Sequence, residues 1–151
     1  MKRHPSLVPI SRQHHGGLLT ARLLQHGAPP YKGMPTTPAA KRVYIINYLK
    51  EHLLAHFELE EQTVFILAAH TSEELKQQAA ALQAAHHLLQ QLILALPQAE
   101  ENDLPDRLHE IGQLLEQHIR QEERVFFEKL QQELPEEKLQ LLHRQVTQQL
   151  P

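Results

Sequence analysis

The sequence predicts an all-α fold, an antiparallel up-down-up-down four-helix bundle with an additional short C-terminal helix. Apolar residues recur at the helical spacing of three and four, and no segment shows the period of two that strands require. Proline and glycine separate four long periodic segments and a short one. With 151 residues, the chain has room for one domain with a sufficient core. We expect a single domain over 1–151, with the bundle at about 5–130.

The first two helices are bounded by glycine and proline. Helix one is expected from about Pro9 to Gln25, although Gly16 and Gly17 interrupt its apolar pattern. A loop then leads to helix two, expected from about Pro38 to Ala69.

The later helices carry their own start and stop signals. Residues 71–74 match a capping box that would start helix three at Thr71, and Pro97 would end it. Asp103 can cap helix four, which tolerates Pro105 in its first turn. Pro135 would open the short amphipathic helix at about 135–149.

The motif His-x-x-x-Glu-Glu occurs twice, from His56 to Glu61 and from His118 to Glu123. Residues four apart on a helix share a face, so each copy directs an imidazole and a carboxylate to one point. The seam of helix two comprises Ile46, Leu49, Leu53, His56, Glu60, Thr63 and Leu67. That of helix four comprises Leu104, Leu108, Ile111, Leu115, His118, Glu122 and Val125. The motif residues therefore point inward.

The other two long helices each offer an inward histidine. Helix three has an apolar frame of Leu75, Ala79, Leu82, His86, Leu89, Ile93 and Leu96. His86 lies on that seam, and His87 points away from it. In helix one, the wheel of its aliphatic residues favours His14 over His15. Four inward histidines and two buried carboxylates require a cation, and these ligands suit iron, zinc or manganese.

The remaining histidines and nearby glutamates have less specific signals. Glu58, Glu61 and Glu123 are interpreted as solvated residues or as supports for the ligands. His52 could orient His56 by a hydrogen bond or lie on the surface. The histidines without a matching frame are expected on the surface: His4, His26, His70, His109 and His143.

The pattern resembles the hemerythrin-like, HHE cation-binding family. That family's order of one His, then His-x-x-x-Glu, then one His, then His-x-x-x-Glu is met by His14, His56, Glu60, His86, His118 and Glu122. The resemblance implies a non-haem di-iron site bridged by both glutamates, with an oxo bridge as an option. Ferritin-like proteins use Glu-x-x-His instead, and no histidine here follows a Glu at that spacing.

The chain departs from the oxygen-carrying members of the family it resembles. They place a second histidine four residues from the first on helix three, where this chain has Leu82 and Gln90. They also have a five-residue His-to-Asp spacing near the end, whereas this chain has His118 and Glu122. The resemblance then implies a more open centre that binds, senses or reacts with oxygen, nitric oxide or peroxide, or responds to iron. The ligand set is also similar to that of bacterial iron-centre repair proteins.

Composition excludes several other functions. With no cysteine, disulfides, iron–sulfur ligation and thiol catalysis are excluded. No phosphate loop or nucleophile motif is found. A mononuclear zinc enzyme would need only three protein ligands, and the six candidate ligands argue against that function. No signal segment or run of 18 apolar residues occurs, so we expect a cytoplasmic protein with no membrane partner.

Charge is unevenly distributed. Residues 1–50 contain eight Lys or Arg and no Asp or Glu. These charges can balance acidic helices within the fold, or form a basic face for a protein partner or a second subunit. The C-terminal helix is another candidate contact. Nucleic acid is not expected, because the net charge is −3 and aromatic residues do not interleave with the basic ones. The alternative function is therefore a helical interaction module that metal only stabilises.

Overall fold

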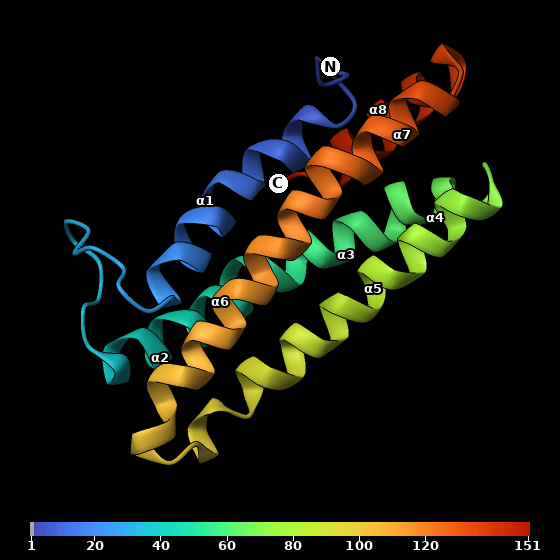
Figure 1. Cartoon of the computed structure of the whole chain (residues 1–151). Helices are drawn as coiled ribbons and strands as arrows, with labels where there is room; N and C mark the ends of the chain where they lie inside the picture. The colour runs from blue at the N-terminus through green and yellow to red at the C-terminus, as the bar shows by residue number, and fades with distance from the viewer. Residues whose placement is uncertain (1) are drawn as a thin grey trace.

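The computed structural model describes residues 2–151, most of which are helical. No strand occurs in this range, so the all-α prediction is confirmed. Figure 1 shows the long segments side by side: α1 (Val8–Leu24), α2 (Pro38–Tyr48) with α3 (Leu54–Gln62), α5 (Glu73–Leu94), and α6 (Leu104–Gln121) with α7 (Phe127–Glu133). Two shorter helices complete the fold, α4 (Val64–Ala69) and α8 (Glu136–Gln149). None of the helices described is both long and apolar enough to cross a membrane.

Two of the predicted helix starts differ in detail. The cap of α5 is Ser72, whose hydroxyl accepts from the backbone N–H of Leu75 at 3.2 Å. The prediction of Thr71 is wrong by one residue, because its hydroxyl instead donates to the Leu67 carbonyl at 2.7 Å. Asp103 precedes α6 but makes no side-chain cap, since its backbone is helical (φ −91°, ψ −14°) rather than extended.

The predicted second helix is interrupted twice. A π-helical turn, Leu49–Leu53, joins α2 to α3, and a break at Thr63 (φ −122°, ψ −83°) separates α3 from α4. The wider turn rotates the residues before it relative to those after it. As a result Ile45 is fully buried and Ile46 only partly, so the predicted seam is wrong at that position.

A second π-helical turn, Glu122–Phe126, joins α6 to α7. It changes the register in the same way. The predicted seam residue Val125 is 40% exposed, whereas Phe126 is completely buried. Both π-helical turns therefore lie next to the repeated motif, one before His56 and one beginning at Glu122.

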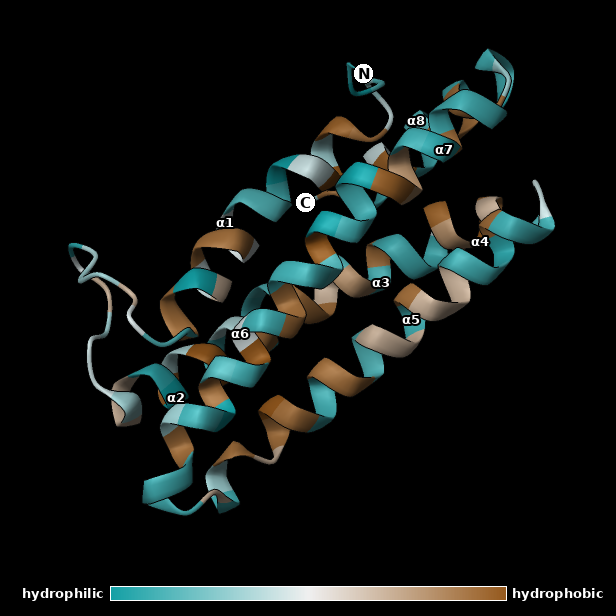
Figure 2. Cartoon of the chain, viewed as in Figure 1, coloured by the Kyte–Doolittle hydropathy of each residue, from teal (hydrophilic) through white to brown (hydrophobic). Residues whose placement is uncertain are grey.

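The apolar core consists of two clusters, with polar residues between them along the helices. On α5 the first cluster extends to Leu82 and the second begins at Leu89, with His86 between them. On α6 the second cluster extends to Ile119, and the first resumes at Phe126 after the π-helical turn. Figure 2 shows hydrophilic and hydrophobic residues alternating around the helices that contribute to these clusters.

Glycines allow α1 and α6 to pack closely. A Cβ on Gly112 would lie 2.5 Å from the carbonyl oxygen of Ala21, and one on Gly17 would lie 2.8 Å from Ile119 Cδ1. Helix α1 continues through Gly16 and Gly17, so these glycines serve packing and do not interrupt the helix. This approach brings His14 close to the π-helical turn that carries Glu122.

Candidate metal centre

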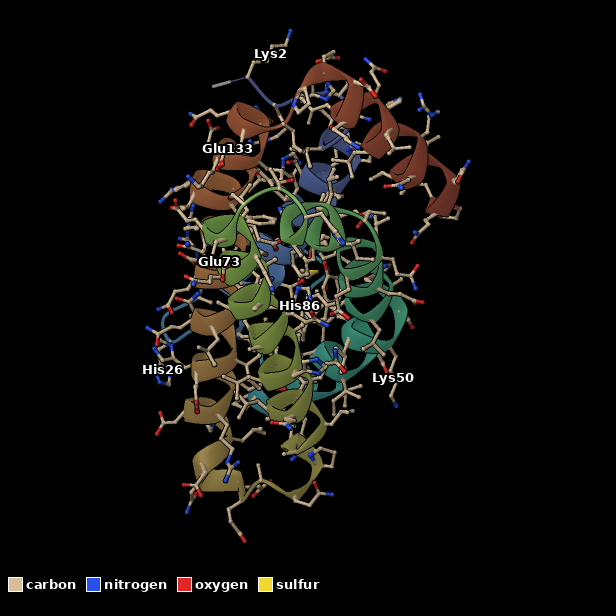
Figure 3. The ribbon with its side chains drawn as sticks, turned by 90° about the vertical axis from the view of Figure 1, so that its right-hand side faces the viewer. Lys2, His26, Lys50, Glu73, His86 and Glu133 are labelled. Atoms are coloured by element: carbon tan, nitrogen blue, oxygen red, sulfur yellow. The ribbon has the colours of Figure 1, made fainter. Side chains whose placement is uncertain are left out.

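All six predicted site residues meet in the interior. They form two overlapping groups, in each of which the potential ligand atoms lie within 4.8 Å of one another. One group is His14, His56, Glu60 and Glu122, and the other is Glu60, His86, His118 and Glu122. Both glutamates therefore belong to both groups. Figure 3 shows His86 inside the molecule, with the labelled charged side chains Lys50, Glu73 and Glu133 farther out.

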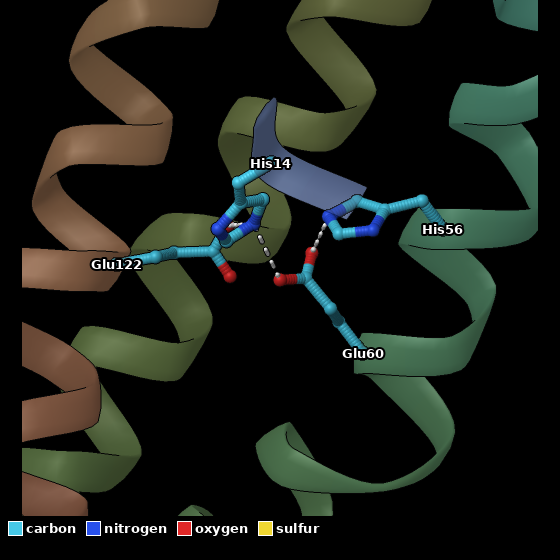
Figure 4. Close-up of side chains that lie close together, drawn as sticks. All are labelled: His14, His56, Glu60 and Glu122. Atoms are coloured by element: carbon cyan, nitrogen blue, oxygen red, sulfur yellow. Dashed lines mark ion pairs between the residues drawn. The ribbon is translucent and has the colours of Figure 1, made fainter. Parts of the chain in front are cut away.

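The first group brings side chains from α1, α3 and the second π-helical turn together (Figure 4). His14 Nε2 lies 3.5 Å from both Glu60 Oε2 and Glu122 Oε1. His56 Nε2 lies 3.3 Å from Glu60 Oε1. Both rings therefore direct Nε2 at the carboxylates. His14 reaches them from α1, and His56 lies on α3 one helical turn before Glu60.

The second group repeats this arrangement with α5 and α6. His86 Nε2 lies 3.1 Å from Glu60 Oε1, and His118 Nε2 lies 3.0 Å from Glu122 Oε1. The two Nε2 atoms are themselves 3.0 Å apart. Four Nε2 atoms therefore converge on two central carboxylates.

Three of the histidines are held by a contact at their other ring nitrogen. Gln13 Oε1 lies 2.6 Å from His56 Nδ1. Glu123 Oε1 lies 2.8 Å from His14 Nδ1, and Glu61 Oε2 lies 2.7 Å from His86 Nδ1. Because these oxygens accept, the proton of each neutral ring is on Nδ1, and Nε2 presents its lone pair to the centre.

The second glutamate of each motif therefore supports a histidine on another helix. Glu61 of α3 contacts His86 of α5, and Glu123 contacts His14 of α1. Of the two interpretations from the sequence, these contacts favour support of the central histidines. Glu58 is exposed and instead accepts a hydrogen bond from Gln62.

Aromatic rings surround two of the histidines. His86 stacks on Phe57, with ring centroids 3.8 Å apart, and on Phe65 at 5.4 Å. His14 stacks on Phe127 at 5.9 Å. The sequence did not indicate these aromatic contacts or the contact of Gln13 with His56. The phenylalanines next to each motif were the available signal, whereas Gln13 lies off the apolar face of its helix.

The centre has donors that match a metal and lack other partners. Both oxygens of Glu60 and of Glu122 are buried, and within residues 2–151 the histidine Nε2 atoms lie close to them without a well-formed hydrogen bond. The same holds for His14 Nε2. Burial of an uncompensated ion costs on the order of several kcal/mol. Imidazole nitrogen and carboxylate oxygen suit iron, zinc or manganese, so the residues present fit a metal ion.

Protons take part in the charge balance of the metal-free centre. Burial lowers the pKa of His14, but contacts with Glu122, Glu123 and Glu60 outweigh burial and raise this pKa to about 12. Burial also lowers the pKa of His86, and contacts with Glu60, Glu122 and Glu61 raise it by more. Burial raises the pKa of Glu60, but the histidines and Glu122 around it hold this pKa well below its ordinary value.

Metal binding is expected to release protons and to strengthen as pH rises. The pKa of His14 lies above its ordinary 6.5, so the ring keeps a second proton at neutral pH that a ligand must lose. That proton also stabilises the metal-free fold, fully below pH 6.5 and progressively less as pH approaches 12. Calorimetric zinc titrations at pH 7, in buffers of different ionisation enthalpy, measure the release. Zinc binding without proton release would contradict the prediction, and His14→Ala should release fewer protons.

One histidine of each adjacent pair is buried and the other is exposed. His14 and His86 are buried, whereas His15 and His87 are exposed. His52 is exposed, and its ring lies 5.1 Å from that of Tyr48. The residue that contacts His56 Nδ1 is Gln13, and not His52 as the sequence had suggested.

The histidines expected on the surface are not all alike. His26 and His70 are exposed, and the other three are partly buried: His4, His109 and His143. His4 contacts Ser6 and Glu136. His109 stacks on His26 at 4.1 Å. None of them reaches the centre.

A cavity of about 520 Å³ lies beside the first group of ligands. Its lining includes the centre's His14, His56 and His118, together with Arg12 and Tyr48. Neither His86 nor Gln90 contributes to it. A small molecule in this cavity would therefore meet the centre from the side of α1 and α3.

Comparison with known proteins identifies the family. No curated protein and no solved structure matches the chain. The model of the hemerythrin HHE cation-binding domain matches residues 10–130. This match spans both copies of the motif and all four central histidines. The chain belongs to the hemerythrin HHE cation-binding domain family.

Proposed function

We propose that the protein is a non-haem di-iron protein that binds, senses or reacts with oxygen, nitric oxide or peroxide. One observation carries the proposal: two ligand groups share Glu60 and Glu122. A single ion beside a substrate position needs about three protein ligands, and six inward ligands exceed that number. A carboxylate with two free oxygens can contact both ions, so Glu60 and Glu122 are proposed as the bridges.

The proposal includes the architecture and the assignment of each side chain. We infer an antiparallel up-down-up-down four-helix bundle within a single domain. His14 and His56 would hold one iron, and His86 and His118 the other. When bound, the iron pair would supply electrons and open coordination positions for a small oxidant or diatomic molecule.

The residues around the centre have three tasks in this proposal. Gln13, Glu61 and Glu123 orient the histidine rings through their Nδ1 atoms. Phe57 and Phe65 exclude water from the side of His86. The cavity beside His14 and His56 admits small molecules. The expectation of an open position beside His86 and Gln90 stays a prediction, and the cavity favours access from the opposite side.

Partners and location remain proposals as well. Part of the basic charge of the first 50 residues is balanced internally, since Arg22 lies 3.8 Å from Glu116 and Arg3 contacts Glu123 and Glu128. Arg12, which lines the cavity, forms no ion pair within the described range 2–151. We propose a cytoplasmic protein with no nucleic-acid partner.

The test is metal analysis followed by spectroscopy. Protein purified without added metal is expected to contain two irons per chain. Adding nitric oxide to the reduced protein should give new absorption bands, and oxygen should oxidise it without a long-lived reversible complex. A single zinc that iron cannot replace would overturn the di-iron proposal. An absorption spectrum that does not change when oxygen, peroxide or nitric oxide is added would instead support a metal-stabilised interaction module.

The variant Gln90→His identifies the side from which nitric oxide binds. If the open position lies beside His86, a new histidine one turn away should fill it and slow both nitric oxide binding and autoxidation. If small molecules bind from the cavity, both rates should remain unchanged while the metal content stays at two.

A further inference from the structure

Arg3 lies outside every helix and contacts Glu123, the carboxylate that supports His14 in the candidate centre. Its Nη2 donates to the carbonyl oxygen of Glu123 at 2.8 Å and to Glu123 Oε2 at 3.0 Å. Its Nη1 lies 3.4 Å from Glu128 Oε1 and donates to Gln131 Oε1 at 3.2 Å. The Arg3 side chain is only 18% exposed. This side chain is therefore fixed against α7 and the second π-helical turn, with two carboxylates beside it.

Two partners of Arg3 contact the same central histidine. Glu123 uses its other oxygen, Oε1, to accept from His14 Nδ1 at 2.8 Å. The Arg3 guanidinium also lies 5.5 Å from the centroid of Phe127, whose ring stacks on His14. Arg3 thus reaches His14 by two independent routes, a carboxylate and an aromatic ring.

Glu61, the carboxylate that supports His86, has different surroundings from Glu123. Glu61 Oε2 accepts from His86 Nδ1 at 2.7 Å, so the two histidines have matching carboxylates. Within residues 2–151, however, no Lys or Arg pairs with Glu61. The two carboxylates are partly buried to a similar extent, 26% exposed for Glu61 and 24% for Glu123. The guanidinium is therefore the main difference between the two supports.

We propose that Arg3 is a positioning residue for His14 and makes the two metal positions unequal. The inference rests on the proposed di-metal function. A carboxylate that accepts from a histidine Nδ1–H makes that ring a stronger ligand. A guanidinium that shares the same carboxylate weakens this effect, because it neutralises part of the negative charge. His14 is then the weaker donor and His86 the stronger one, so the iron beside His14 is the one more easily kept reduced.

The test uses Arg3→Gln, Arg3→Lys and Arg107→Gln in the iron-loaded protein. Two one-electron steps are expected in a spectroelectrochemical titration. Arg3→Gln should move one of them to a more negative potential, by about 59 mV for a tenfold change in the ratio of oxidised to reduced iron. Arg3→Lys should restore part of the shift because it keeps the charge. Arg107→Gln, which removes an exposed arginine about three helical turns before His118, should change neither step.

A second measurement does not depend on iron. In zinc-loaded and metal-free protein, Arg3→Gln should shift the Nδ1–H proton resonance of His14 and leave that of His86 in place. Equal shifts of both resonances, or of neither, would overturn the role of Arg3, as would two unchanged reduction steps. Failure of the wild type to bind two metals would refute the proposed function alone, because the metal-free resonances would still test Arg3.

Discussion

In the proposed di-metal protein, Glu60→Ala is expected to remove at least one of the metals. Glu60 is completely buried and belongs to both ligand groups, with Oε1 3.1 Å from His86 Nε2 and Oε2 3.5 Å from His14 Nε2. Its loss takes an oxygen from each position and leaves the histidine nitrogens without their central partner. The decrease in affinity should exceed the 10- to 100-fold that is roughly typical of residues behind the ligands. Elemental analysis after gel filtration measures the metals retained per chain.

Glu61→Ala is the matched control, because it removes a carboxylate one residue away. Glu61 contacts only the outer nitrogen of His86, so this variant should retain both metals and lose affinity by about 10- to 100-fold. Circular dichroism distinguishes loss of metal from loss of fold. If Glu61→Ala loses metal and Glu60→Ala does not, the inward face of α3 has been assigned one residue out of place. Glu122→Ala and Glu123→Ala make the same comparison in the other copy of the motif.

The sequence was sufficient to predict which face of each long helix is inward at the motifs. All seven seam positions of the predicted helix three are buried, because α5 has a regular period from Leu75 to Ile93 and the 3₁₀ turn that follows it includes Leu96. The choices of His14 over His15 and of His86 over His87 agree with the observed burial. Helical spacing and the polarity of the opposite face were enough in these cases.

The seam predictions failed where the helix itself changes. A strict alternation of three and four assumes about 3.5 residues per turn, close to the 3.6 of an α-helix, and each π-helical turn adds a residue. Ile46 and Val125 were therefore assigned to the seam in place of Ile45 and Phe126. Neither turn contains a proline or glycine that would indicate it in the sequence. The first turn reads Leu-Lys-Glu-His-Leu and the second Glu-Glu-Arg-Val-Phe.

Contacts between helices were the other part that the sequence did not determine. Spacing along one helix identifies the first glutamate of each motif, but Glu61 and Glu123 act on histidines of other helices. Their partners depend on how closely the helices pack and on their relative height. Arg3 is a stronger case, since it lies outside every helix and contacts residues 120 and more positions away.

His14→Ala and His86→Ala are each expected to reduce the metal content from two toward one. Each histidine belongs to only one of the two ligand groups, unlike the glutamates. Removing it leaves the other group complete, so the second metal should remain. The variants should therefore differ from Glu60→Ala in the number of metals retained. Elemental analysis gives that number, and the absorption spectrum of the iron protein shows whether the paired centre is lost.

The neighbouring histidines provide controls of the same chemistry. His15 and His87 are exposed, so His15→Ala and His87→Ala should retain two metals with nearly unchanged affinity. An equal loss within either pair would mean that both imidazoles reach the centre, contrary to the observed burial. Retention of both metals by His14→Ala, with loss in His15→Ala, would require α1 to be rotated by one residue. That rotation would also break the close packing of Gly17 on Ile119.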